Sequence, residues 1–533
     1  MKSEAARGLL RMMSNYARLA VTLAMGLVLA RFTLHWVGND GAGLILFLGA
    51  NVGIAAMFRE ITIRAVVQEL AHADHSEDRD HFRRVLSSAM ALSSVMSFVA
   101  AAVFAVLYFT LPLFEIPQEL MAPARAMVVS QGIYIMLYTW LTPIYNMLLV
   151  RERFVAQNFW AIIERAAWLG SALLLSYGFG MNGNPTRDLT AFAWCICAFN
   201  CSTYLIPVAW LLVANPELRP RRELVTPEIR RQLTRNTGRY IAVEAASALH
   251  EKVGMMIMNY YFGLAAGNLV FGMALQFVSY VRQATQGVTF GIEAVSARVS
   301  TRKKDSMSAL VHHGTRLHGL VALPAGVCAF FLAEPLIRLW IGSKIEHPEI
   351  YLPKIGAVAQ ILVIALTARA ISDGWMMILY GAGHLKRYAP LVLAGGIANP
   401  VFSIALLLVA PERVALYVVP TVFCVVYTAV HFFMLPRVAA ACLSIRYGEI
   451  FSPLLRPAIA TALSTPVLLL AGRLFARTGW HWNPYTTGAA VMAFGMVFGL
   501  LSALIVLTPQ ERDRFLWSPL RKVWGRSLPA GGA

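Results

Sequence analysis

The sequence has few charged residues and no segment polar enough to form a soluble domain. Only 14% of its 533 residues are Asp, Glu, Lys or Arg, whereas an ordinary soluble domain carries about 25%. Apolar residues make up 58% of the chain, and the mean hydropathy is +0.60. A soluble or disordered chain of this composition would expose much apolar surface to water, so both classes are excluded. The apolar runs are about 20 residues long and do not alternate, which excludes a transmembrane β-barrel.

Sequence signatures of several other function classes are also missing. We find no Walker A motif, so the chain is not itself an ATP-driven pump. The six cysteines lie inside or beside apolar segments, and we interpret them as small buried residues rather than a disulfide framework. The net charge is +18, but the basic residues are spread over short loops, which argues against nucleic-acid binding. His72, Asp74, His75 and Asp78 belong to a mixed-charge loop, so we expect neither a metal site nor a cofactor.

Hydropathy predicts an all-α polytopic membrane protein with about fourteen spans. The predicted spans are 15–36, 41–66, 85–111, 125–150, 158–177, 189–213, 237–262, 268–290, 314–333, 355–379, 389–409, 414–435, 457–476 and 486–507. Loops on the side of the N-terminus hold 28 Lys and Arg residues and the opposite loops hold 6, which predicts that both termini are cytoplasmic. We expect the first span, preceded by Lys2, Arg7 and Arg11, to act as an uncleaved insertion signal.

The longest predicted cytoplasmic linker divides the chain into parts. We expect an N-terminal six-helix lobe (1–213), the linker (214–236), a C-terminal six-helix lobe (237–436), and two additional helices with a cytoplasmic tail (437–533). Thr226, Pro227 and Glu228 read as the start of a helix. We expect this helix to be short and basic and to lie on the anionic inner leaflet; a plain solvated connector is the alternative.

Similar short motifs occur at corresponding positions of the two predicted lobes. Asn15-Tyr-Ala-Arg18 opens the first span as Asn236-Thr-Gly-Arg239 opens the seventh, and Gly38 and Gly43 match Gly263 and Gly267. A parallel repeat of this kind is the plan of many transporters, with the site between the repeats. We therefore predict a pseudo-two-fold axis along the membrane normal that superposes Gly38 on Gly263.

Three stretches carry a resemblance to a known family: 15–44, 260–298 and Glu334 to Gly342. These stretches, together with the predicted arrangement of two six-helix lobes followed by two additional helices, resemble the polysaccharide transporter family. Its members are bacterial flippases for polyprenyl-diphosphate-linked oligosaccharides, within the multidrug/oligosaccharidyl-lipid/polysaccharide exporter superfamily. The resemblance implies a transporter rather than an enzyme, located in the inner membrane among its lipids and serving surface polysaccharide assembly.

Charged residues at bilayer depth mark candidate sites, because each needs a partner, water or an exit to the interface. In the second span, the i, i+4 spacing predicts an ion pair between Glu60 and Arg64, and Arg59 then has no predicted ion-pair partner. By the repeat, Arg59 corresponds to position 283, next to Arg282. The resemblance places both arginines in one central chamber. A guanidinium can bind two diphosphate oxygens at once, so we predict Arg59, Arg282 and Arg64 as substrate-binding residues. The alternative is snorkelling or clamping of a neighbouring helix, and snorkelling is our expectation for Arg18 and Arg239.

Further membrane charges have simpler interpretations. Glu244 and Glu251 share a helix face and are our candidates for coupling to protons or sodium ions. Arg369 and Asp373 are spaced for a structural ion pair. We expect Glu164 in a charged cluster at the cytoplasmic edge.

Three other functions stay open. Lipid II export shares the diphosphate and is not separable by sequence. A drug or metabolite exporter would prefer an acidic and aromatic cavity for cationic cargo. A membrane polymerase or ligase acting on lipid-linked sugars would need a larger extracytoplasmic loop than 334–354.

Overall fold

The computed structural model describes residues 2–76, 78–151, 153–289, 292, 296, 299, 304–478 and 482–513. The elements in chain order are α1 (Lys2–His75), α2 (Arg79–Thr110), α3 (Gln118–Tyr145), α4 (Met147–Val150), α5 (Phe154–Leu173), α6 (Pro185–Ala214), α7 (Pro227–Glu251), α8 (Val253–Phe262), α9 (Val270–Thr289), α11 (Lys304–Phe331), α12 (Ala333–Ile341), α13 (Pro348–Gly381), α14 (Leu385–Leu407), α15 (Glu412–Thr428), α16 (Leu435–Leu443), α17 (Tyr447–Thr478), α18 (Pro484–Leu501) and α19 (Pro509–Arg512). Short π-helical turns follow several of them, including η5 (Gly263–Leu269) and η6 (Ala429–Met434).

Twelve helices of the described residues are long and apolar enough to cross a membrane. The all-α polytopic fold class is therefore confirmed, whereas the count of fourteen spans is not. Two of the twelve candidates, Ala17–Ala50 and Tyr240–Gln283, contain the places where the sequence predicted a turn between two spans. The chain bends there at Gly38 and Gly263.

The two bends have the same backbone conformation. Gly38 has φ 70° and ψ −174°, and Gly263 has φ 70° and ψ −167°. Positive φ favours glycine because a side chain would clash with the backbone there. The bends also touch, since a Cβ on Gly43 would lie 2.5 Å from the carbonyl oxygen of Leu264. This shared geometry agrees with the sequence repeat, while the lobe boundaries stay a prediction.

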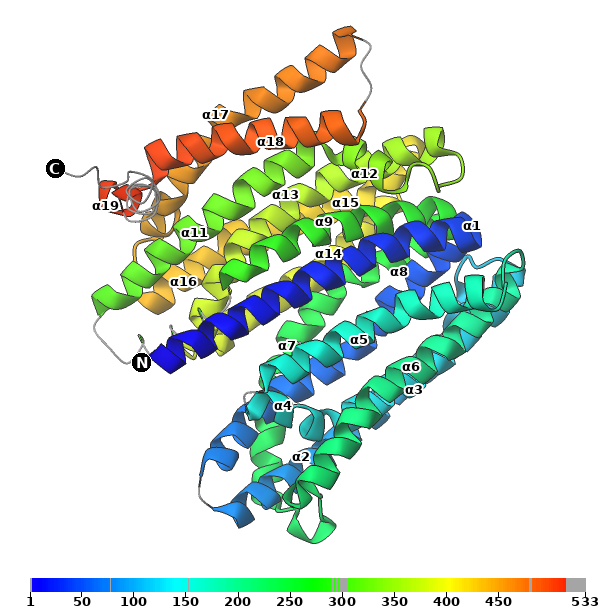
Figure 1. Ribbon diagram of the computed structural model, residues 1–533, viewed down its shortest axis with the longest axis vertical. Coiled ribbons are helices and arrows are strands. Elements are labelled where there is room, and N and C mark those ends of the chain that lie inside the picture. The colour runs from blue at the N-terminus through cyan, green and yellow to red at the C-terminus, as the bar shows by residue number, and fades with distance from the viewer. Residues whose placement is uncertain are drawn as a thin grey trace, which may run out of the picture.

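The helices form two bundles with separate apolar cores (Figure 1). The first bundle, α2 to α6 with the second half of α1, buries a large cluster that includes Phe47, Phe82 and Phe192. The second bundle, α8 to α16, buries clusters around Phe271 and Trp375. The first half of α1 contacts both bundles, since Ala30 and Leu34 belong to the second bundle's core and Trp36 to the first bundle's, and residues of its second half also belong to both cores. As a result, α1 joins the two bundles.

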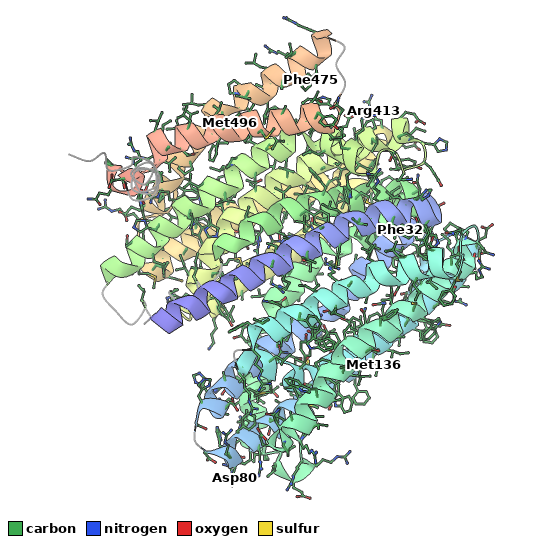
Figure 2. The ribbon with its side chains drawn as sticks, in the orientation of Figure 1. Phe32, Asp80, Met136, Arg413, Phe475 and Met496 are labelled. Atoms are coloured by element: carbon green, nitrogen blue, oxygen red, sulfur yellow. The ribbon has the colours of Figure 1, made fainter. Side chains whose placement is uncertain are left out.

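The helix ends lie on two opposite sides of the molecule, which we call the linker side and the Gly38 side (Figure 1). The linker side holds the α6–α7 linker and the start of α1, and the Gly38 side holds the two glycine bends (Figure 1). Asp80 and Arg413 mark helix ends on these opposite sides (Figure 2). The beginning of α1 and the end of α19 lie on one side, as an even number of spans requires.

The linker differs from the sequence prediction in one respect. A helix does begin at Pro227, but it runs without interruption to Glu251 as α7. Its early residue Leu233 is fully buried in the first bundle's core. The expected separate helix on the leaflet is therefore wrong, because apolar burial holds the start of α7 against the protein.

The two C-terminal helices, α17 and α18, lie on the outer face of the second bundle, away from the first (Figure 1). Beyond them, Glu511 of α19 forms an ion pair with Arg316 of α11. The backbone N–H of Thr508 and the Arg316 guanidinium lower the pKa of Glu511 to about 2. This pair attaches the segment after α18 to the second bundle.

Candidate functional site

Arg59 lies in the second half of α1 with its partner next to it in sequence. Its Nε and Nη2 donate to Oε1 of Glu60, at 3.0 and 2.6 Å. The guanidinium carbon stands 4.5 Å from the centre of the Tyr138 ring, within cation–π range. Glu60 therefore pairs with Arg59, and the prediction that Arg59 would be left over is wrong. The predicted Glu60–Arg64 pair lies outside the described residues, because the side chain of Arg64 is not among them.

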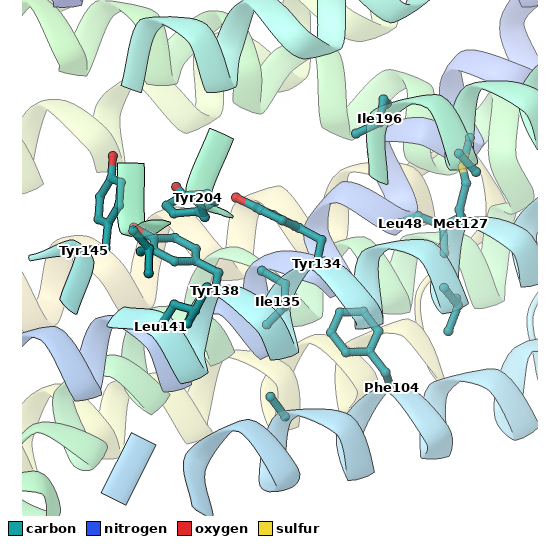
Figure 3. Packing of buried hydrophobic residues seen from close by; sticks show 14 of the residues in the cluster. Leu48, Phe104, Met127, Tyr134, Ile135, Tyr138, Leu141, Tyr145, Ile196 and Tyr204 are labelled. Carbon is teal, nitrogen blue, oxygen red and sulfur yellow. The ribbon is translucent and has the colours of Figure 1, made fainter. Parts of the chain in front are cut away.

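The Tyr138 ring that Arg59 contacts belongs to a group of buried tyrosines that lie side by side (Figure 3). The rings of Tyr138 and Tyr204 stack with centroids 3.7 Å apart. Tyr134 and Tyr204 donate their hydroxyls to the two carboxylate oxygens of Glu164, each at 2.6 Å. Glu164 sits ten residues into α5, about 15 Å from its start. The expectation that it belongs to a charged edge cluster is therefore wrong, because two tyrosines from other helices stabilise it deeper inside.

Arg282 of α9 lies in the second bundle between two carboxylates. Its Nη1 donates to Glu251 Oε1 at 3.2 Å, and its Nε and Nη2 donate to Asp373 Oδ2 at 3.3 and 3.2 Å. Tyr427 adds a hydroxyl hydrogen bond to the same Glu251 oxygen, at 3.1 Å. Arg282 and Thr285 also line a small, partly open pocket between α9, α11 and α13.

A second arginine completes this cluster. Arg369 Nε lies 2.8 Å from Asp373 Oδ1 without the alignment of a hydrogen bond, so the predicted ion pair between these residues is confirmed as a charge contact. Arg369 Nη1 lies 2.9 Å from Nδ1 of His431, which belongs to the π-helical turn η6. The sequence suggested only a local pair, whereas the structure joins four helices around it.

The predicted residues thus fall into two groups. The contacts of Arg59 come from the first bundle and those of Arg282 from the second, so these contacts do not bring the two arginines together. Their shared chamber stays a prediction. Glu251 contacts Arg282, and Glu244 lies two turns earlier on α7. The side chain of Arg239 lies outside the described residues.

Sequence reasoning missed the tyrosines, Glu164 and Tyr427. The spacing of Tyr134 and Tyr138, and of Tyr427 and His431, was a usable signal, because residues four apart share a helix face. A polar aromatic pair on one face of a membrane helix indicates a buried polar cluster.

Hydrogen bonds on the Gly38 side join α1 to the α12–α13 segment of the second bundle. Asn39 of α1 donates to the Glu346 carbonyl at 3.1 Å and accepts from the Glu346 N–H at 3.2 Å. Trp340 Nε1 donates to the Leu27 carbonyl at 2.9 Å. These bonds hold α1 against the α12–α13 segment and close the bundles together on this side.

No protein-family model matches the chain, and no curated protein sequence matches it. Solved structures do match. The lipid II flippase MurJ in an inward closed conformation gives a TM-score of 0.67 at 11% identity, covering 93% of this chain and 98% of that one. An inward-facing multidrug resistance MATE family transporter of the MOP superfamily gives 0.60 at 11% identity, covering 79% and 94%. The Vibrio cholerae MATE transporter VcmN, as a point mutant, gives 0.57 at 13% identity, covering 85% and 99%.

These likenesses show that the chain has the fold of the multidrug/oligosaccharidyl-lipid/polysaccharide (MOP) exporter superfamily. The fold that the sequence resemblance implies is thereby confirmed, whereas membership of the superfamily and of the polysaccharide transporter family stays a prediction. The matched structures are transporters, in agreement with the expectation that the chain is not an enzyme.

Proposed function

We propose that this protein is a flippase that moves a polyprenyl-diphosphate-linked oligosaccharide across the bacterial inner membrane for surface polysaccharide assembly. The observation that carries the proposal is the extent of the likeness to the lipid II flippase, whose chain is covered to 98% while this chain is covered to 93%. The inward-facing MATE transporter leaves about a fifth of this chain unmatched. A lipid-linked saccharide and lipid II present the same diphosphate, so lipid II itself is the nearest alternative cargo.

Arginine chemistry supports a diphosphate headgroup. Arg59 and Arg282 are the proposed contacts, with Arg64 as a third, because a guanidinium fork binds two phosphate oxygens in one plane. Arg59 donates to Glu60 through Nε and Nη2, and among the described residues its Nη1 has no acceptor, so we propose Nη1 as the donor to the diphosphate. Both termini are proposed to face the cytoplasm, from which the cargo is taken up.

The test is flipping of a fluorescent polyprenyl-diphosphate saccharide in proteoliposomes. We expect Arg59→Ala and Arg282→Ala each to slow flipping about tenfold or more, since a hydrogen bond to a charged group is worth about 1.5–3 kcal/mol. Lysine at either position should rescue only in part, because it loses the planar fork. Arg338→Ala is the matched control, since Arg338 pairs with Glu334 at the exposed surface. Normal flipping by both alanine variants at normal protein levels would reject the site.

The driving force can be tested in the same vesicles. A diphosphate carries about two negative charges, and moving one charge through 100 mV is worth about 2.3 kcal/mol, so uncompensated outward transfer gains about 4–5 kcal/mol. Flipping should then respond to an imposed potential without a proton or sodium gradient. Glu244 and Glu251 are the residues that an obligatory ion coupling would use. Strict dependence on one ion gradient, with no response to potential, would favour that coupling.

One observation favours a second function, the export of a cationic drug or metabolite. Among the described side chains, the environment of Arg59 is aromatic and includes two carboxylates, Glu60 and Glu164. Acidic and aromatic groups suit cationic cargo. Uptake of ethidium into inverted vesicles, together with no flipping of the saccharide lipid, would select this function over the first.

A further inference from the structure

The guanidinium of Arg282 occupies a position that suits a bound cation. Two carboxylates, from Glu251 and Asp373, approach it at 3.2 Å each, and the side chain is only 18% exposed. The hydroxyl of Tyr427 lies 3.1 Å from the same Glu251 oxygen. We propose that Arg282 is a tethered counter-cation: it fills the cation site that Glu251, Asp373 and Tyr427 would otherwise form, so that this site needs no proton or sodium ion from solution. This inference concerns the driving ion and does not depend on the cargo.

The charges of the cluster balance without a mobile ion. Arg282 and Arg369 supply two positive charges, and Glu251 and Asp373 supply two negative charges. A buried carboxylate without a counter-charge costs several kcal/mol of desolvation. The two arginines meet this requirement through four contacts of 2.8 to 3.3 Å. A further cation would add an uncompensated positive charge.

Removal of the guanidinium should turn the same oxygens into a cation site. Oxygen ligands from carboxylates and a hydroxyl suit hard cations. When Arg282 is replaced, Arg369 still pairs with Asp373, so the two carboxylates exceed the remaining arginine by one charge, which a proton or a metal ion can balance. Sodium and protons should therefore compete for the site once Arg282 is replaced.

Other titratable and charged groups surround the cluster and bear on its pH dependence. They come from every helix packed against it: His250 and Lys252 beside Glu251, His318 on α11, Arg369 on α13, and Tyr427 and His431 on α15 and η6. Lys252 also approaches α1, since a Cβ on Gly53 would lie 3.0 Å from its Cε. Sodium binding therefore has to be measured at two pH values.

The first bundle provides a matched control. Arg59, which the predicted repeat places one position from Arg282, has one carboxylate partner among the described residues, Glu60, whose side chain is 38% exposed. The other nearby acid, Glu164, is already engaged by two tyrosine hydroxyls. Loss of the Arg59 guanidinium should therefore leave no pair of carboxylates able to bind one cation.

The experiment measures the Tm of the purified full-length protein in NaCl and in choline chloride at equal ionic strength, at pH 6 and pH 8. Wild-type protein should give the same Tm in both salts. Arg282→Gln should gain a saturable rise of about 2 °C or more in NaCl, larger at pH 8 because fewer protons compete. The double variant Arg282→Gln/Glu251→Gln should lose this rise, and Arg59→Gln should show none.

Two results would overturn the proposal. One is a saturable sodium effect on wild-type Tm that Glu251→Gln removes, because the site would then bind a mobile ion despite Arg282. The other is an Arg282→Gln variant that folds and ignores sodium at both pH values. Should Arg282→Gln fold only in NaCl, the rescue supports the proposal. Arg282→Lys keeps a tethered charge and should fold and ignore sodium; a sodium-dependent Tm in this variant would also refute the inference.

Discussion

The contact between Asn39 and Glu346 should control the balance between conformations of the two bundles. Asn39 is 4% exposed and makes two hydrogen bonds to the backbone of Glu346, in the loop between α12 and α13. Asn39→Ala removes both. Because each hydrogen bond contributes about 1 kcal/mol net, the closed arrangement on the Gly38 side should lose about 2 kcal/mol relative to an open one. That difference changes the population ratio about 30-fold.

The population can be measured with spin labels on the Gly38 side, in a background without the native cysteines. Suitable exposed positions are Gln118 in the first bundle and Glu349 in the second. Double electron–electron resonance should show a longer-distance population in Asn39→Ala that is minor in the parent. Ser343→Ala is the control, because it removes only the exposed hydrogen bond from Arg31 and should shift the ratio little.

The reasoning would be refuted by an unchanged distance distribution in Asn39→Ala, given a folded protein. The bundles would then be held on this side by apolar packing and the remaining contacts, such as Trp340 with the Leu27 carbonyl. A shift of equal size in Ser343→Ala would also contradict it, because burial would then make no difference to the contribution of a hydrogen bond.

Three further predictions concern topology, pH dependence and the glycine bends. A membrane-impermeant thiol reagent applied to intact cells should miss a cysteine at Val225 and label one at His347; a labelled Val225→Cys would reverse the orientation. The Glu511 pKa of about 2 lies below the usual value of about 4.3, so its pairing with Arg316 stabilises the fold above about pH 4.3 and is lost as the pH falls toward 2. Hydrogen exchange of α19 should rise over that window in wild-type protein, whereas Glu511→Gln should show fast exchange at every pH; a flat wild-type profile contradicts the pairing. Gly263→Ala should lower the free energy of unfolding by about 1–2 kcal/mol, and with it the Tm, because alanine is strained at the positive φ of this position. The control is Gly472→Ala on α17, where an added Cβ would meet open space. Equal effects of the two substitutions would exclude a conformational cause.

Hydropathy predicted the helices because the membrane leaves few alternatives. Every spanning segment must satisfy its own backbone hydrogen bonds, so a long apolar run has to be a helix. The bend glycines Gly38 and Gly263 were visible through the repeat, since an unusual backbone conformation recurs with the residue that permits it. The continuity of α7 was not visible, because the burial of Leu233 depends on helices that lie far away in the sequence.

The partners of the charged residues were predictable only at short range. The spacing of Arg369 and Asp373 indicated their contact, because residues four apart share a helix face. For Glu60 the structure shows a contact with its neighbour Arg59, which the rule did not indicate, while the predicted contact with Arg64 lies outside the described residues. The contact of Arg282 with Asp373 joins residues 91 apart, and no local pattern records such a distance.

Arg59 and Arg282, which the predicted sequence repeat places one position apart, differ in how readily they can exchange partners. Arg282 is held by two carboxylates that are 24% and 10% exposed, so releasing it would leave two buried negative charges. Among the described residues, the carboxylate that pairs with Arg59 is Glu60, whose side chain is 38% exposed and can move into water at a lower desolvation cost. If the cargo is a diphosphate, Arg59 is therefore the arginine that replaces a carboxylate with phosphate oxygens, while Arg282 contributes only its remaining N–H groups. The repeat thus places the same residue type in both bundles, and the partners give each a different role.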